Sequence, residues 1–390
     1  MRIPQISLLL LMFVTFIGCG DSEHAPAGII ATIQVGLAPR AVDVNPTTNR
    51  IYILQGDRQG MTLPGTVSVI DGATNTVTAT VPVGVSACQL AVDPTTNKIY
   101  VTNKGEQFVT VIDGVTNNTS TVNVGPGSCS LAVNKVTNKI YVATFSDVVV
   151  IDGTTNNTTN IVVTGVPVDV AVNSVTNKIY AGTLVGGFLG NLTVIDGATN
   201  STTNVLLGKS YAANQIGEIA IDSETNRIYA SLFFYHGSWV ANIDGASLTV
   251  KSIANGDMYD PLGSIAVNPT TNNIYVAHSS GLVSVIDGAT LNATSIMAGS
   301  NPHFITVDPA LNQTYVLNGS TEPNLLGNTV TVIDGATNST VTLGVDVDPI
   351  AASVNPTTHR VYVVNSCGND PNCVYPGSVP GTVSVIEGAR

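Results

Sequence analysis

Eight tandem copies of one pattern constrain this chain more than any other feature of its sequence. The phrase Asn-Pro-Thr-Thr-Asn-Arg-Ile-Tyr at residues 45–52 returns in variant forms, and it alternates with a second phrase, Val-Ile-Asp-Gly-Ala-Thr-Asn. Successive repeat tyrosines are 39 to 49 residues apart, and such a period predicts one supersecondary unit per repeat. The repeat tyrosines are Tyr52, Tyr100, Tyr141, Tyr180, Tyr229, Tyr275, Tyr315 and Tyr362. The repeat acids are Asp71, Asp113, Asp152, Asp196, Asp244, Asp287, Asp334 and Glu387.

Each repeat is predicted to form four short strands. In the second repeat these are residues 89–93, 98–102, 109–113 and 120–124, which are rich in Val, Ile, Thr and Tyr and alternate roughly with period two. Asn, Asp and Gly fill the two turns because they tolerate left-handed backbone angles and bond to their own turn amides. Four-stranded antiparallel units of this length in tandem are typical of β-propeller blades.

The two ends of the repeat region complement each other. The eighth repeat stops after its third strand, whereas residues 28–36 form a strand with no repeat of its own. Pairing the two closes the ring and removes an exposed edge. We therefore predict an all-β, eight-bladed propeller over residues 28–390. The predicted blades span residues 37–83, 84–124, 125–163, 164–207, 208–254, 255–298, 299–343, and 344–387 together with 28–36.

The segment Asn97-Lys98-Ile99-Tyr100-Val101-Thr102-Asn103 resembles the signature of the YVTN-repeat β-propeller family, which is known from surface-layer and other exported proteins. The resemblance extends over residues 28–390 and implies the propeller fold. It implies no catalytic residues, because the family shares none.

The N-terminal segment predicts export. An apolar run at residues 6–17 follows Arg2 and is too short to span a bilayer, so residues 1–18 are expected to be a signal peptide. Residues 16–19, Phe-Ile-Gly-Cys, resemble the lipobox of bacterial lipoproteins. This implies that Cys19 is acylated, that residues 19–27 form a lipidated tether, and that the protein meets the membrane of the cell envelope only through this anchor. The alternative is an ordinary signal peptide in which Cys19 is incidental.

Charge and motifs exclude several function classes. The net charge of −12, without any cluster of basic residues, argues against nucleic acid as a partner. The sequence carries no cofactor-binding or catalytic motif, and His278 and His303 have no clear third ligand that would indicate a metal site. No cofactor or metal is therefore expected, and the oligomeric state is left open.

The four cysteines other than Cys19 suit an oxidising compartment. Cys367 and Cys373 flank a turn-rich loop and are predicted to form a disulfide. Cys88 and Cys129 occupy the same position in neighbouring blades, and they either pair or remain free thiols, depending on the distance between their Cα atoms.

Loop lengths predict where a site could lie. The segment from repeat tyrosine to repeat acid varies from 11 to 25 residues, whereas the Pro-Thr-Thr-Asn and Asp-Gly-Ala-Thr-Asn turns barely change. The variable loops should emerge on one face, and loops on a rigid scaffold are where function concentrates. The longest lie in blades 7, 8 and 1, at residues 319–328, 366–381 and 56–65.

A second sector, in blades 5 and 6, collects aromatic residues. Six of the 11 aromatic residues outside the signal and the repeat tyrosines fall between residues 211 and 259, and exposed Tyr and Trp near carboxylates suit sugar or peptide binding. The alternative is that Phe233 and Trp239 pack between blades. The predicted binding residues are Tyr211, Phe234, Tyr235, His236, Trp239, Asp257, Tyr259 and Asp260.

The function expected from these patterns is a non-enzymatic binding module at the cell envelope, with an unidentified protein, peptide or glycan ligand. Two alternatives remain open: a propeller enzyme of the lyase or quinoprotein-like type, and a structural component of a surface coat. The repeat acids are interpreted as turn residues rather than as catalytic or metal-binding groups.

Overall fold

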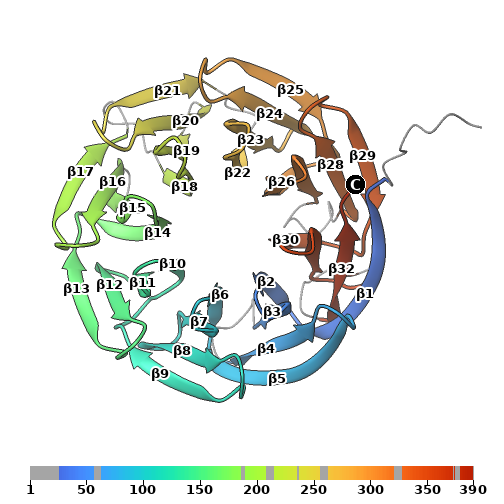
Figure 1. Cartoon of the computed structure of the whole chain (residues 1–390), viewed down its shortest axis with the longest axis horizontal. Helices are drawn as coiled ribbons and strands as arrows, with labels where there is room; N and C mark the ends of the chain where they lie inside the picture. Colours follow the sequence, from blue (N-terminus) through green and yellow to red (C-terminus); the bar gives the residue numbers. More distant parts are fainter. Residues whose placement is uncertain are drawn as a thin grey trace, which may run out of the picture.

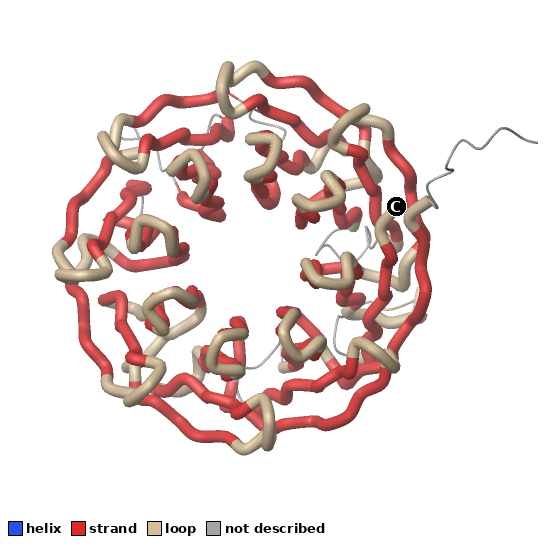
Figure 2. Tube along the Cα trace, viewed as in Figure 1, coloured by secondary structure: helices blue, strands red, loops and turns tan. Residues whose placement is uncertain are grey.

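The computed structural model shows a closed ring of eight four-stranded antiparallel sheets around a central channel (Figures 1 and 2). It describes residues 26–56, 63–185, 189–207, 215–234, 237–254, 262–319, 327–371, 373 and 378–389. No helix among these residues is long and apolar enough to cross a membrane. The predicted propeller and its count of eight blades are confirmed.

Within each blade the strands run from the channel to the rim. Blade 1 comprises β2 (Pro39–Asn45), β3 (Arg50–Gln55), β4 (Pro64–Asp71) and β5 (Thr76–Val85). Blade 2 comprises β6 (Ala87–Asp93), β7 (Lys98–Asn103), β8 (Phe108–Asp113) and β9 (Thr119–Asn123). Blade 3 comprises β10 (Ser130–Asn134), β11 (Lys139–Ala143), β12 (Asp147–Asp152) and β13 (Thr158–Val162). Blade 4 comprises β14 (Val166–Asn173), β15 (Lys178–Val185), β16 (Leu189–Asp196) and β17 (Thr202–Leu206).

The second half of the ring repeats this order. Blade 5 comprises β18 (Gln215–Asp222), β19 (Arg227–Phe234), β20 (Gly237–Asp244) and β21 (Val250–Ala254). Blade 6 comprises β22 (Leu262–Asn268), β23 (Asn273–His278), β24 (Leu282–Asp287) and β25 (Ala293–Met297). Blade 7 comprises β26 (Pro302–Asp308), β27 (Gln313–Asn318), β28 (Thr329–Asp334) and β29 (Thr340–Gly344). Blade 8 comprises β30 (Pro349–Asn355), β31 (Arg360–Asn365), β32 (Pro380–Glu387) and β1 (Gly28–Leu37).

The ring is closed by β1, which is the outermost strand of the last blade (Figure 1). It pairs antiparallel with β32, with Ile29 opposite Ile386 and Ile33 opposite Val383. The predicted pairing of the two ends of the repeat region is therefore confirmed. Because β1 covers the free edge of β32, the last blade has four strands like the others.

The core lies between blades. All eight repeat tyrosines are fully buried, and the buried apolar residues form clusters that each draw on two neighbouring blades. For example, Tyr100 and Val111 of blade 2 share one cluster with Leu131 and Val142 of blade 3. The tyrosines are therefore packing residues between blades. Successive side chains of a strand point to opposite faces of its sheet, so the period-two pattern lets each blade bury one set of side chains against each of its two neighbours.

One face of the ring carries both short turns of blades 1 to 7 and the single short turn of blade 8, and we call it the turn face. Each repeat acid from Asp71 to Asp334 accepts hydrogen bonds from the backbone N–H groups two and three residues ahead. In Asp113 these bonds, from Thr116 and Val115, lower the pKa of the carboxyl group. The acids therefore have the structural role that was predicted for them.

A ladder of side-chain hydrogen bonds joins neighbouring blades on the turn face. At five of the eight blade boundaries, the asparagine at the end of an inner strand donates to an asparagine held at positive φ in the next blade, as Asn134 donates to Asn177 over 2.9 Å. In blades 2 and 5 the inner strand ends in an aspartate instead, Asp93 or Asp222. The same bond runs from Asn355 to Asn49 across the ring closure. Between blades 7 and 8 the pair is Asp308 and His359 instead, 2.9 Å apart.

Candidate binding site at the channel mouth

The opposite face, which we call the loop face, carries the connections that differ between blades. The inner strands surround the channel (Figure 2). They begin on the loop face, so their first residues lie at the mouth of the channel. The residue eleven positions before each repeat tyrosine is polar in blades 2 to 6 and apolar in blades 7, 8 and 1. We call these residues the inner ring. They are Ala41, Gln89, Ser130, Asp169, Glu218, Ser264, Phe304 and Ala351.

The polar part of the inner ring joins blade to blade. Gln89 Oε1 accepts a hydrogen bond of 2.8 Å from the backbone N–H of Leu131 in the next blade. Three further members repeat this bond: Ser130 Oγ accepts from Val170 N over 3.2 Å, Asp169 Oδ2 from Ile219 N over 3.1 Å, and Glu218 Oε2 from Ile265 N over 3.1 Å. Ser130 Oγ also donates to Asp169 Oδ1 over 2.9 Å.

Two of the residues that make these bonds between blades, Asp169 and Glu218, carry buried carboxyl groups. Burial raises the pKa of Asp169, against the hydrogen bonds from Ser130 and from the backbone of Ile219 and Val170. Burial raises the pKa of Glu218 to about 7, and the nearby Asp169 adds to this shift. Desolvation disfavours the charged form of a carboxyl group, so both groups hold a proton more tightly than in water.

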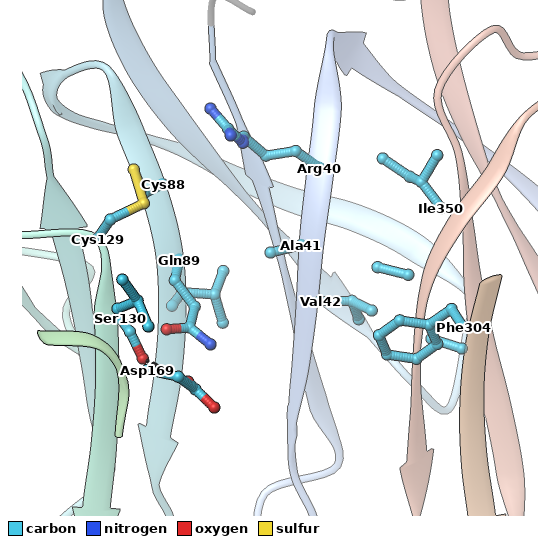
Figure 3. Close-up of a pocket in the computed structure, with 14 residues that line it drawn as sticks. Arg40, Ala41, Val42, Cys88, Gln89, Cys129, Ser130, Asp169, Phe304 and Ile350 are labelled. Atoms are coloured by element: carbon cyan, nitrogen blue, oxygen red, sulfur yellow. Dashed lines mark hydrogen bonds between the residues drawn. A yellow bond between two sulfur atoms is a disulfide. The ribbon is translucent and has the colours of Figure 1, made fainter. Parts of the chain in front are cut away.

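A cavity of about 400 Å³ lies in the channel beside this ring. Figure 3 shows Gln89, Ser130 and Asp169 on one side of it and Val42, Phe304 and Ile350 on the other. Blades 2 to 4 therefore supply the polar groups Gln89, Ser130 and Asp169, beside Leu90, Val168 and the disulfide, whereas the wall from blades 7, 8 and 1 is mostly apolar. The full lining is Arg40, Ala41, Val42, Cys88, Gln89, Leu90, Cys129, Ser130, Val168, Asp169, Phe304, Ile350, Ala351 and Ala352.

Two disulfides are present: the predicted Cys367–Cys373 bond, and a Cys88–Cys129 bond that the sequence left open. Cys88 and Cys129, with Cα atoms 5.2 Å apart, join blades 2 and 3 at the channel mouth. Cys367 and Cys373, with Cα atoms 5.8 Å apart, close a loop of blade 8. Structural disulfides persist in oxidising compartments, so the two bonds indicate an extracytoplasmic protein.

Most of the predicted aromatic sector lies outside the described residues: Tyr211, Tyr235, His236, Asp257, Tyr259 and Asp260 do, as does the acylation candidate Cys19. Phe234 is the last residue of β19. Trp239 of β20 is half-buried and packs against the cluster between blades 4 and 5, and Phe233 packs against the cluster between blades 5 and 6. These two contacts are those of the alternative that was left open, packing between blades.

An exposed aromatic residue that the sequence analysis did not single out lies in blade 3. Phe145 is 56% exposed, in the short loop between β11 and β12. Its ring covers Gly127, where an added Cβ would lie 2.4 Å from the ring carbons. Gly127 also has φ of +78°, which favours glycine. The ring of Phe145 therefore packs on a backbone position that requires glycine. Gly127 lies two residues before Cys129 of the Cys88–Cys129 disulfide.

The two histidines near the mouth show no metal-site geometry. His278 Nε2 lies 2.8 Å from Ser284 Oγ, and burial lowers the pKa of His303. Among the described residues, no three His, Cys, Asp or Glu side chains come together as a metal ion would require.

Comparisons with known proteins give the fold and no family. No protein-family model matches the chain, and no curated protein matches it. Among solved structures, the chain is similar to the Dos1 propeller, with a TM-score of 0.70, 12% identity, and coverage of 93% of this chain and 95% of that one. It is also similar to hydrazine synthase of Kuenenia stuttgartiensis, with a TM-score of 0.57, 17% identity, and coverage of 95% and 99%. At these identities the likeness is one of fold alone.

Proposed function

We propose that this β-propeller is a binding module of the cell envelope that recognises a protein, peptide or glycan through its loop face. One observation carries the proposal: the turn face repeats the same hydrogen bonds in blade after blade, whereas differences in loop length are confined to the opposite face. A surface that is individual in each blade, on a rigid scaffold, is suited to selective recognition. The exposed ring of Phe145 adds an aromatic contact of the kind enriched at binding hot spots.

Blade 3 offers a matched test, because it exposes an apolar side chain on each face. Phe145 is on the loop face, and Val136, 75% exposed, is in a turn of the turn face. A panel of glycans and peptides is screened for thermal stabilisation, since a ligand that binds only the native state must raise its apparent stability. For a stabilising compound, Phe145→Ala, Tyr235→Ala or Tyr259→Ala should weaken binding, and Val136→Ala should not. Binding lost only in Val136→Ala would overturn the proposal.

Anchoring through a lipid on Cys19 is part of the same proposal. It is supported by the lipobox-like residues 16–19 and is compatible with the two disulfides. Replacing Cys19 with Ser should release the protein from the membrane fraction, since a single acyl-bearing residue is the anchor. Unchanged fractionation of Cys19→Ser would argue for an ordinary signal peptide.

A further inference from the structure

The channel cavity is a second site, separate from the loops, because inner strands and not loops supply its principal walls. Its volume of about 400 Å³ lies within the range of small-molecule sites. Residues from six blades line it, and the hydrogen bonds of Gln89, Ser130 and Asp169 to the next blade fix its polar wall. A cavity held in this way is preformed, so a ligand that fits would lose little affinity to ordering the protein.

Asp169 is the acidic group in the lining, and its charge is not balanced locally. The groups that favour its ionised form are the Ser130 hydroxyl and the backbone N–H groups of Ile219 and Val170, with no cation among them. Arg40, the cation in the lining, donates Nη1 to the carbonyl oxygen of Ala87 over 3.0 Å at the mouth. A buried carboxylate with hydrogen bonds but no counter-charge gains from a cation brought next to it.

Asp169 Oδ1 accepts a hydrogen bond from Ser130 Oγ, and Asp169 Oδ2 accepts one from the backbone N–H of Ile219 in the next blade. A carboxylate oxygen has two lone-pair sites, so the group retains capacity to accept from a ligand. Across the cavity, the ring of Phe304 and the side chains of Val42 and Ile350 offer an apolar surface (Figure 3). The two walls together suit a molecule with a charged donor at one end and an apolar body.

We propose that the channel cavity binds a small organic cation, a primary ammonium on an aromatic or aliphatic ring, with the ammonium at Asp169 and the ring against Phe304. This site does not depend on the loop-face proposal: a compound of this class reaches the inner strands through the channel, and loop variants such as Phe145→Ala should leave its binding unchanged.

Glu218 provides the matched control. It occupies the same inner-ring position one blade further on and makes the same bond to the next blade, yet it is not part of the cavity lining. Asp169→Asn and Glu218→Gln therefore each replace a carboxyl group that accepts a hydrogen bond from the next blade with an uncharged amide. Of the two residues, only Asp169 lines the cavity. Ala41→Leu is the second test variant, because Ala41 lines the cavity and a larger apolar side chain there takes up part of its volume without removing a hydrogen-bonding group.

The experiment is calorimetric titration of the full mature protein with benzylamine, benzyl alcohol and phenylacetate. Benzylamine should bind with a dissociation constant of about 1 mM, as suits a ligand of this size, and at least ~10-fold more tightly than the other two. Asp169→Asn and Ala41→Leu should each weaken benzylamine binding by ~10-fold or more, and Glu218→Gln by less than ~2-fold. The proposal is overturned if the alcohol or the acid binds as well as the amine, if benzylamine does not saturate the native protein, or if Ala41→Leu leaves its affinity unchanged.

Discussion

On the turn face, Asn134 donates to Asn177 in the next blade and Asn173 repeats this bond to Asn226 one blade further on. Around the channel mouth, by contrast, the residue that accepts from the next blade differs in each of blades 2 to 5. There it is an amide at Gln89, a hydroxyl at Ser130 and a carboxyl group at Asp169, and a disulfide joins blades 2 and 3 as well. The turn face is thus what the repeat itself dictates. The mouth is where the sequence has departed from the repeat while keeping the blades joined.

The largest expected effect comes from breaking what both faces share, the closure of the ring. Deleting residues 28–36 removes nearly all of β1 and exposes the edge of β32 along nearly all of its paired length. We expect loss of the cooperative unfolding transition or aggregation, because an open, unpaired edge is a template for association. Circular dichroism melting and size-exclusion chromatography check this. A truncated chain that melts like one lacking only residues 20–25 would show that β1 is dispensable.

The two disulfides differ in how much of the chain they constrain. Cys88–Cys129 closes 41 residues and Cys367–Cys373 closes six, so the loop-entropy relation gives about 4 and about 2 kcal/mol. Replacing each pair with serines should lower the free energy of unfolding in that order, as measured by chemical denaturation. Equal losses, or a larger loss from the Cys367–Cys373 pair, would mean that the mouth is held by the inner-ring hydrogen bonds without help from the disulfide.

The fold was predictable from the sequence because its determinants are local and repeated eight times. The strands of blade 2 were predicted within two residues of β6 to β9, since Asn97 and Asp113 mark turns by their own backbone chemistry. The ring closure was predictable for the same reason: a strand missing at one end and unmatched at the other can be counted.

The inner ring was not predicted, although its positions can be counted from the repeat tyrosines. Cys88 and Cys129 were matched as equivalent positions of neighbouring blades, but the residues that follow them, Gln89 and Ser130, were not compared around the ring. Whether Asp169 and Glu218 face the channel or a neighbouring blade depends on strand twist and on bulges such as the one between Ile216 and Ile219. Composition and period do not carry that information.

The two faces should also differ in how their carboxyl groups make the stability of the fold depend on pH, and Glu218 is the clearest case on the loop face. Its pKa is raised by burial from 4.5 to about 7 in the folded protein. The folded state therefore holds this proton more tightly than the unfolded state, and the resulting stability is fully present below pH 4.5 and is lost as the pH rises through about 7. The turn-face acids have the opposite sign: local hydrogen bonds lower the pKa of Asp113, so its contribution is lost on acidification.

Glu218→Gln should remove this pH dependence, because blade 2 already uses a glutamine for the same bond: Gln89 accepts from Leu131 N as Glu218 accepts from Ile265 N. Relative to the native protein, the variant should gain about 3 kcal/mol of stability between pH 4.5 and pH 8, from the size of the shift. Denaturant unfolding of both proteins across this range measures the difference. Asp113→Asn is the control, and its difference from the native protein should stay constant over the same range and change only at lower pH. If the free energy of unfolding depends on pH in the same way for Glu218→Gln and for the native protein, the carboxyl group is solvated in the channel. The inner ring would then join its blades without an energetic cost of burying a charged group.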